Sequence, residues 1–205
     1  MLQNLPKCSS YILIDTEYLI SKINEGYRFY KDLYPDREFE QFDILNMINI
    51  VASTTKITVP NETTNIVFLY KLGNSSFPNA KGFQDVLRFA DFRNTVSLSN
   101  DEGSTINFYS FFADPFGDEF SYNCEYNDLL REIVSKKDVF TIIMCKDGHE
   151  QNDLLEKFNS TIDKSFYIFR DIDPEIGLSD YSEKFRYVTI DYVIALCMGL
   201  KQREW

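Results

Sequence analysis

The stretch that decides the fold is residues 9–19, Ser-Ser-Tyr-Ile-Leu-Ile-Asp-Thr-Glu-Tyr-Leu. Its centre, residues 11–14, is a continuous apolar run that ends at Asp15. A short apolar run without alternation is typical of a strand that is buried on both faces of a parallel sheet. Residues 16–23 carry a partial apolar stripe and indicate the start of a helix. A buried strand followed at once by a helix is the pattern of an α/β domain.

The same alternation continues along the chain. We expect further strands at 65–70, 106–112, 139–144 and 166–169, and helices at 38–52, 83–93, 126–136, 150–158 and 189–200. Residues 97–105 (Ser-Leu-Ser-Asn-Asp-Glu-Gly-Ser-Thr) are the most loop-like stretch, which we interpret as an excursion within one domain. This order predicts a single α/β domain over residues 1–205, a three-layer, Rossmann-like sandwich around a mainly parallel central sheet.

Composition restricts the class of protein and its partners. The chain has 205 residues, of which 44% are hydrophobic and 16% aromatic, and this content is enough for a packed core. Its formal net charge is -11, so at long range it repels a phosphate backbone. RNA therefore remains a possible but disfavoured partner, and a basic protein partner is plausible. Carboxylates that bind a divalent cation would reverse the charge locally.

Cysteine spacing and hydropathy indicate the compartment. The four cysteines form no CxxC motif, and Cys145 and Cys197 lie in apolar runs typical of a core. The first residues, Met-Leu-Gln-Asn-Leu-Pro-Lys-Cys-Ser-Ser, lack the features of a signal peptide. The apolar runs are also too short to cross a bilayer. We expect an intracellular, cytoplasmic protein that makes no contact with a membrane.

Acidic residues follow several of the expected strands. They are Asp15, Asp114, Asp147 and Asp171. Parallel strands end at one edge of a sheet, where α/β proteins bind their ligands. The helix before the strand that leads to Asp147 carries Asp128 and Glu132, and one of these two acids could join this edge. Clustered carboxylates repel each other, and Mg²⁺ or Mn²⁺ removes that repulsion and can activate water for attack on a phosphodiester.

Structural roles for the same residues stay open. An acid after a strand often caps the next helix, and Asp171 beside Pro174 could form a turn. Asp128 and Glu132 could belong to a solvated helix face. His149 is the chain's one histidine, which argues against a histidine metal triad or a Ser-His-Asp triad. The sequence has no GxGxxG and no P-loop motif.

Two segments resemble the PIN/NYN-like nucleases. Tyr-Ile-Leu-Ile-Asp-Thr-Glu-Tyr-Leu (11–19) looks like their first strand, which ends in Asp. Thr-Ile-Ile-Met-Cys-Lys-Asp-Gly-His-Glu-Gln-Asn-Asp-Leu-Leu (141–155) resembles their later strand and its Ser-x-Asp-x-Asp-Phe motif. The resemblance implies a PIN-like fold and an Mg²⁺- or Mn²⁺-dependent endoribonuclease. The implied catalytic and metal-binding residues are Asp15, Asp128 and Asp147, with Asp153 as a further ligand and Glu17, Glu150 or Asp153 orienting water.

The chain also departs from the family pattern. Tyr18 stands where Asn is usual, Cys145 stands where Ser is common, and His149 replaces the second Asp of the Asp-x-Asp pair. These departures support an alternative, a catalytically degenerate PIN-like domain that acts as a protein-interaction subunit. A phosphatase of the haloacid dehalogenase type ranks lower, because Glu17 and Leu19 stand where that family has Asp and Thr.

Overall fold

The computed structural model describes residues 8–40, 42–55, 62–71, 96–99, 103–114, 116–136, 140–145, 166–170 and 185–200. In chain order the described elements are β1 (Ser10–Asp15), α1 (Thr16–Leu33), α2 (Ile44–Thr55), β2 (Thr63–Lys71), β3 (Val96–Ser99), β4 (Thr105–Ala113), α4 (Glu119–Val134), β5 (Phe140–Met144), β6 (Phe166–Arg170), β7 (Phe185–Thr189) and α6 (Ile190–Cys197). Strands alternate with helices, which confirms the α/β class.

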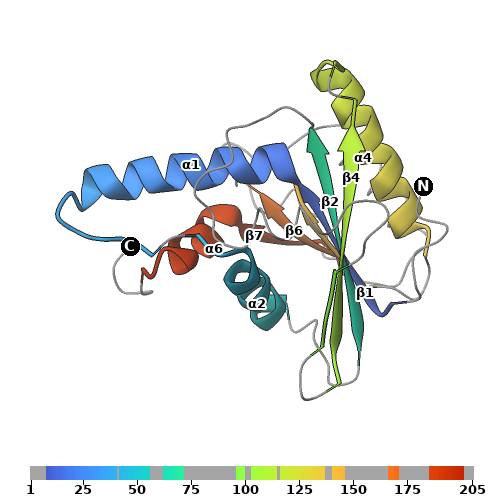
Figure 1. The fold of residues 1–205 in the computed structure, drawn as a ribbon, viewed down its shortest axis with the longest axis horizontal. Coiled ribbons are helices and arrows are strands. Elements are labelled where there is room, and N and C mark those ends of the chain that lie inside the picture. Colours follow the sequence, from blue (N-terminus) through green and yellow to red (C-terminus); the bar gives the residue numbers. More distant parts are fainter. Residues whose placement is uncertain are drawn as a thin grey trace.

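The strands form one seven-stranded sheet in the order β3-β4-β2-β1-β5-β6-β7 (Figure 1). All neighbouring pairs are parallel except β3 and β4, which are antiparallel. From β1 the chain builds outward through β2 and β4, and then returns to the other side of β1 to build β5, β6 and β7. The direction of building therefore reverses at β1, between its neighbours β2 and β5.

Strand β1 lies at the centre, and all six of its residues are buried. Its neighbours are in matching register, because Ile14 pairs with Phe68 of β2 and with Met144 of β5. The three strands therefore reach the same edge of the sheet together. This burial explains the continuous apolar run of residues 11–14, since both faces of the strand pack against helices.

Successive residues of β1 point into two different cores. Ile12 and Ile14 pack in a cluster with residues of α1, α2 and α6, whereas Tyr11 and Leu13 pack in a cluster with residues of α4. Figure 1 shows α1, α2 and α6 on one side of the strands and α4 on the other. Helices therefore cover both faces of the central strands.

Two buried polar pairs bridge neighbouring strands. Ser10 Oγ and Thr64 Oγ1 lie 2.8 Å apart, and Asn107 Nδ2 donates to Asn65 Oδ1 at 2.9 Å. Each pair joins residues that are also register partners, Ser10 with Thr64 and Asn65 with Asn107. A shift in register would separate these groups inside the core, where lost hydrogen bonds are costly. The pairs thus favour the observed alignment of β1, β2 and β4.

Most element positions expected from the sequence are confirmed, but several boundaries differ. Helix α1 starts at Thr16, as expected, and runs to Leu33, and its last turns extend beyond the strands in Figure 1. Helix α2 starts at Ile44 instead of residue 38, because Asp43 Oδ1 accepts from the backbone N–H groups of Leu45 and Asn46. Helix α4 starts at Glu119, seven residues earlier than expected, behind an N-cap at Asp118.

Two strands were not expected. Part of the loop-like stretch 97–105 is strand in the structure, because β3 pairs antiparallel with β4 through Ser97–Asn107 and Leu98–Ile106. β7 is a second addition, and it pairs with β6 along five residues. The helices expected at 83–93 and 150–158 lie outside the described residues. No helix in the described ranges is long and apolar enough to span a membrane.

Gly26 provides a test of the packing between α1 and α6. A Cβ on Gly26 would lie 2.7 Å from Ile194 Cγ2, and Ile194 is buried and β-branched. We therefore expect Gly26→Ala to destabilise the protein by about 1–3 kcal/mol in urea denaturation, because of overpacking. In an Ile194→Ala background the same change should stabilise by about 1 kcal/mol, because alanine is then the better helix former. A stability change of the same sign in the wild-type and Ile194→Ala backgrounds would contradict the observed contact between Gly26 and Ile194.

Candidate functional site

Asp15 is the last residue of β1 and the N-cap of α1. Only 6% of it is exposed. Its Oδ1 accepts a hydrogen bond from the backbone N–H of Tyr18 at 3.1 Å, as an N-cap carboxylate does. The same oxygen accepts from the hydroxyl of Tyr122 at 2.8 Å. One buried carboxylate oxygen thus joins the central strand to helices on both faces of the sheet.

Tyr122 comes from the first part of α4 and is itself buried. Its hydroxyl oxygen also lies 3.0 Å from the carbonyl oxygen of Leu69, near the end of β2. The single hydroxyl proton therefore has two acceptors, of which the Asp15 carboxylate is the stronger when it is ionised. Burial and the nearby Asp15 carboxylate both raise the pKa of Tyr122, so this side chain stays a neutral donor.

The position of Asp15 alters its acidity. Burial raises its pKa from the usual 3.8 to about 6, against the opposing effect of the hydrogen bonds from Tyr18 and Tyr122. The negative charge of Glu17 raises it further. A carboxylate whose pKa is raised by burial at the edge of a parallel sheet is typical of ligand-binding and catalytic sites.

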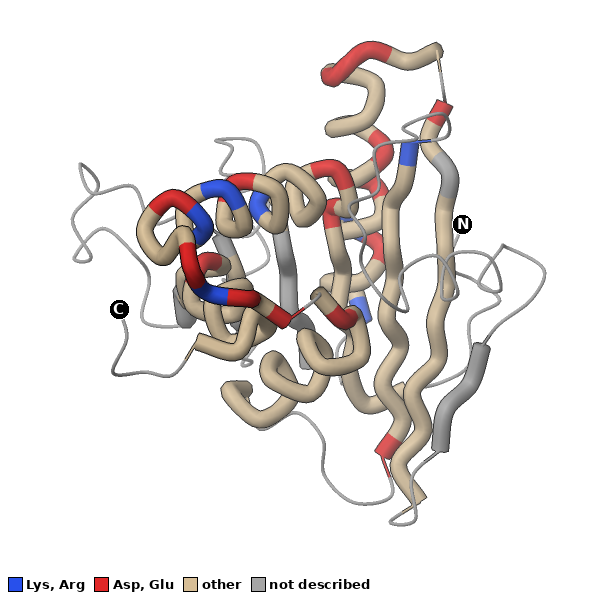
Figure 2. Tube along the Cα trace, turned by 60° about the vertical axis from the view of Figure 1, so that its left-hand side comes forward, with Lys and Arg blue, Asp and Glu red and all other residues tan. Residues whose placement is uncertain are grey.

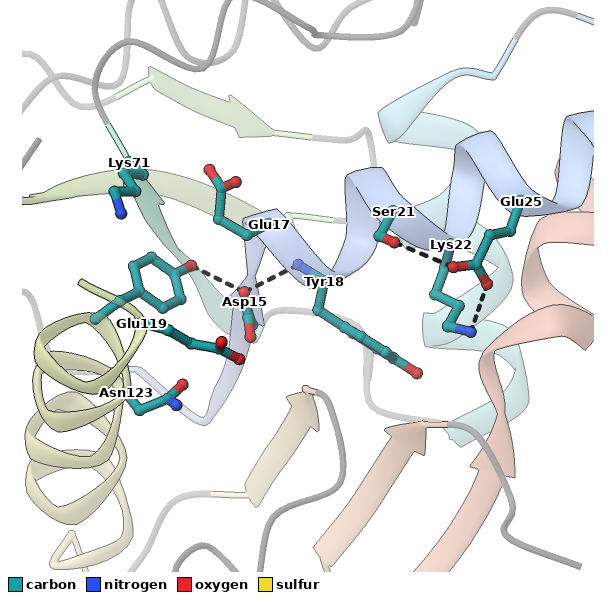
Figure 3. A pocket seen from close by; sticks show the side chains of 10 residues that line it. Asp15, Glu17, Tyr18, Ser21, Lys22, Glu25, Lys71, Glu119 and Asn123 are labelled. Atoms are coloured by element: carbon teal, nitrogen blue, oxygen red, sulfur yellow. Dashed lines mark hydrogen bonds and ion pairs between the residues drawn. The ribbon is translucent and has the colours of Figure 1, made fainter. Parts of the chain in front are cut away.

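A pocket of about 460 Å³ opens beside Asp15 (Figure 3). Its lining residues come from β1, α1, β2 and α4, and they are Asp15, Glu17, Tyr18, Ser21, Lys22, Glu25, Lys71, Glu119, Tyr122 and Asn123. Figure 3 shows the side chain of Glu119 pointing from α4 toward the Asp15 carboxylate, with Asn123 below it. The pocket therefore offers carboxylate, amide and phenol groups at the carboxyl edge of the sheet.

Two lysines reduce the negative charge of the pocket. Lys22 Nζ lies 2.7 Å from Glu25 Oε2, and the hydroxyl of Ser21 donates to the other oxygen of Glu25 at 3.2 Å. On the opposite side, Lys71 Nζ donates to the carbonyl oxygen of Gly117 at 2.6 Å. Lys71 thereby links the end of β2 to the turn before α4, and its positive charge stays at the pocket.

Among the described residues, the structure separates Asp128 from Asp15. Asp15 lies in the pocket, and Glu17 also lines it. Asp128 lies on an exposed face of α4, with its side chain 71% exposed and its Oδ1 2.5 Å from Nη1 of Arg131. It does not line the pocket, and its surroundings fit the solvated helix face that the sequence left as the alternative. Asp114, expected at the same edge, accepts at Oδ1 from the backbone N–H of Phe116 and forms a turn.

The other candidates lie outside the described residues. They are Asp147, His149, Glu150, Asp153 and Asp171. Strand β5 (Phe140–Met144) precedes Asp147 in the chain, and Cys145, the described residue that follows this strand, is buried as expected. Within the described ranges, no group of three or more Asp, Glu, His or Cys side chains is placed to hold a metal ion.

Sequence reasoning missed Glu119 and Tyr122. Both belong to the first turns of α4, a segment that was expected to precede the helix. The sequence signal for this helix start is Asp118, a residue type that often caps helices. In the structure its Oδ1 accepts from the backbone N–H and from the hydroxyl of Ser121, both at 2.8 Å. An N-cap at Asp118 brings Glu119 and Tyr122 onto the helix beside the end of β2.

The raised pKa of Asp15 predicts how stability depends on pH. Since the folded protein holds this proton more tightly than the unfolded chain, ionisation costs stability as the pH rises from about 3.8 to about 6. Asp15→Asn keeps a good N-cap and removes the charge. In urea denaturation, we expect the free energy of unfolding of Asp15→Asn to rise relative to that of the wild type as the pH increases. The rise should be about 3 kcal/mol between about pH 4 and about pH 7. A difference that does not change with pH would mean that Asp15 is not buried as described.

Comparison of the chain with protein-family models, with curated proteins and with solved structures finds no match.

Proposed function

We propose that this chain is a PIN-like domain, a three-layer α/β sandwich, that hydrolyses phosphodiester bonds of RNA with a divalent cation bound at the carboxyl edge of its sheet. The observation that carries the proposal is the buried Asp15 carboxylate, which ends the central strand and faces a pocket of about 460 Å³. Counted in chain order, the parallel strands lie in the order 3-2-1-4-5-6, which is that of doubly wound folds. Such folds bind ligands where the strand order reverses, beside β1 here.

The register of β5 supports a role for Asp147. Met144 pairs with Ile14, so Cys145 follows the strand at the level of Asp15. Asp147 comes two residues later in the chain. In this proposal Asp15 and Asp147 are ligands of Mg²⁺ or Mn²⁺, cations that prefer carboxylate oxygens. Asp153 is a further candidate from the resemblance.

The third carboxylate of the proposed site is Glu119. Glu119 lines the pocket and points toward Asp15, whereas Asp128 pairs with Arg131 on an exposed face of the same helix (Figure 3). A cation held between these acids supplies the Lewis acidity that activates water and stabilises the leaving oxygen. Lys71, at the pocket, supplies positive charge for a phosphate that the acidic chain as a whole repels.

A second function also has an observation in its favour. Both hydrogen bonds to Asp15 Oδ1 are structural, because one caps α1 and the other attaches α4 to the central strand. A carboxylate that makes these two structural hydrogen bonds is needed for the fold even in a domain without catalytic activity. This favours a degenerate PIN-like domain that serves as a protein-interaction subunit. The two functions differ in one property, since only the first requires the cation.

Cleavage of single-stranded RNA tests the proposal. We expect the full chain to cleave a labelled oligoribonucleotide with Mn²⁺ and to lose about 100-fold or more in rate on Asp15→Asn or Glu119→Gln, because each change removes a carboxylate from the cation site. Asp128→Asn should leave the rate unchanged and thus separates Glu119 from Asp128 as the third acid. Asp32→Asn is the matched control, because it makes the same charge change in an exposed residue of the last turn of α1.

Thermal unfolding with Mn²⁺ separates the two functions. A cation that binds only the folded state raises the melting temperature, and Asp15→Asn should abolish that rise. No cleavage together with no rise would leave the degenerate domain as the function. Cleavage by the wild type that persists at an unchanged rate in Asp15→Asn would mean that the activity belongs to another site.

A further inference from the structure

The turn before α4 presents two phenylalanines to solvent. Phe116 is 95% exposed and Phe120 is 67% exposed. They stand four residues apart, in the turn and in the first turn of the helix, and Glu119 between them lines the pocket. Exposed large apolar side chains that occur together mark interaction surfaces more often than isolated ones do. We call Phe116, Phe120 and the acids of residues 114–125 the α4 entry surface.

The backbone beneath these rings is firmly held. The backbone N–H of Gly117 donates to the carbonyl oxygen of Asp114 at 3.1 Å, and that of Phe116 donates to Asp114 Oδ1 at 2.9 Å. Lys71 Nζ donates to the carbonyl oxygen of Gly117, which ties the turn to β2. A Cβ at Gly117 would make tight contacts, 3.2 Å from Asp114 O and from Ser121 Cβ, so the turn packs closely against the start of α4. The two rings are therefore presented on a preorganised backbone, which lowers the entropic cost of binding.

The charge around the rings selects the partner. Residues 114–125 contain four acids, Asp114, Asp118, Glu119 and Glu125, and no lysine or arginine, so the single positive charge of Lys71 at the turn leaves the surface net negative. The beginning of α4, at the top of Figure 2, shows this run of acidic positions. Away from the proposed cation site these acids repel nucleic acid, even though exposed aromatic rings can stack on bases. A protein segment that combines apolar side chains with lysine or arginine matches both the rings and the charge.

The far end of α1 provides a contrast. Phe29 is 61% exposed and Leu33 is 53% exposed, so this end is also apolar at its surface. However, both signs of charge occur among its neighbours Arg28, Lys31 and Asp32, so charge selects no partner there. Phe29 also packs against Tyr30, with ring centroids 5.1 Å apart. This end therefore serves as an internal control.

We infer that the α4 entry surface is a docking site for a basic, apolar segment of a protein partner, bound beside the pocket through Phe116 and Phe120. The inference does not depend on hydrolysis in the pocket, because its two anchoring side chains, Phe116 and Phe120, lie outside the pocket lining. It goes beyond the proposed function by assigning a second surface and the chemistry of its partner. Aromatic residues on rigid backbone are common hot spots of protein interfaces.

Selection from a library of short random peptides tests the inference. The full-length chain is used as bait, and enriched peptides are synthesised and measured by fluorescence anisotropy. We expect peptides that carry aromatic or aliphatic residues and a net positive charge, bound more weakly as salt is raised. Their affinity should fall by about tenfold or more in Phe116→Ala/Phe120→Ala, as for hot-spot residues. It should stay unchanged in Phe29→Ala.

The same experiment contains the outcomes that would overturn the inference. Enriched peptides that bind the double variant as tightly as the wild type, or that are acidic, would refute it. Binding of a single-stranded oligoribonucleotide that depends on both phenylalanines, without binding of basic peptides, would assign the surface to nucleic acid. Because both rings are exposed, the variants should keep the wild-type melting temperature, which is measured alongside. Loss of RNA cleavage in Asp15→Asn would leave peptide binding intact, so the two proposals fail separately.

Discussion

The hydrogen bonds to Asp15 Oδ1 are the interaction on which the rest of the structure depends. The carboxylate sits at the end of β1, where it caps α1 through the N–H of Tyr18 and holds α4 through the hydroxyl of Tyr122. Helices α1 and α4 cover opposite faces of the sheet, so this one carboxylate links a helix on one face to a helix on the other. The cost of burying the carboxylate is visible in its pKa, which is raised to about 6.

This arrangement connects the fold to the pocket. Because β1, β2 and β5 run parallel and in register, their carboxyl ends meet at one edge. The building direction of the sheet reverses there, and open α/β sheets carry a ligand-binding crevice at such a point. Asp15 stands in that crevice with Glu119 and Lys71, which come from α4 and from the end of β2. The geometry that makes Asp15 a good cap is the same geometry that places it in the pocket lining.

Sequence periodicity predicted the α/β class and the central strand correctly, because a strand buried on both faces needs a continuous apolar run such as residues 11–14. It failed at element boundaries decided by caps, since Asp43 and Asp118 are single residues in polar surroundings. It also missed β3 and β7, the two edge strands, because their sequences, Val-Ser-Leu-Ser and Phe-Arg-Tyr-Val-Thr, contain polar residues and lack a continuous apolar run.

The site was predicted in part. Asp15 follows from the rule that parallel strands end at one edge, and the pocket lies beside it. Asp128 was chosen from its place on a helix near the expected site, but helical periodicity alone does not say which face meets the sheet. The structure turns Asp128 to solvent and brings Glu119 to the pocket in its place. The hydrogen bond between Tyr122 and Asp15 joins residues that are far apart in the chain, and no local sequence pattern predicts such a contact.

The most direct measurement of the central claim is the anomalous diffraction of crystals soaked with Mn²⁺. The account predicts one manganese peak in the pocket, with carboxylate oxygens of Asp15, Glu119 and Asp147 in its coordination sphere. A map without manganese in the pocket, or with the carboxylates of Asp15 and Asp147 directed to opposite sides of the molecule, would contradict it.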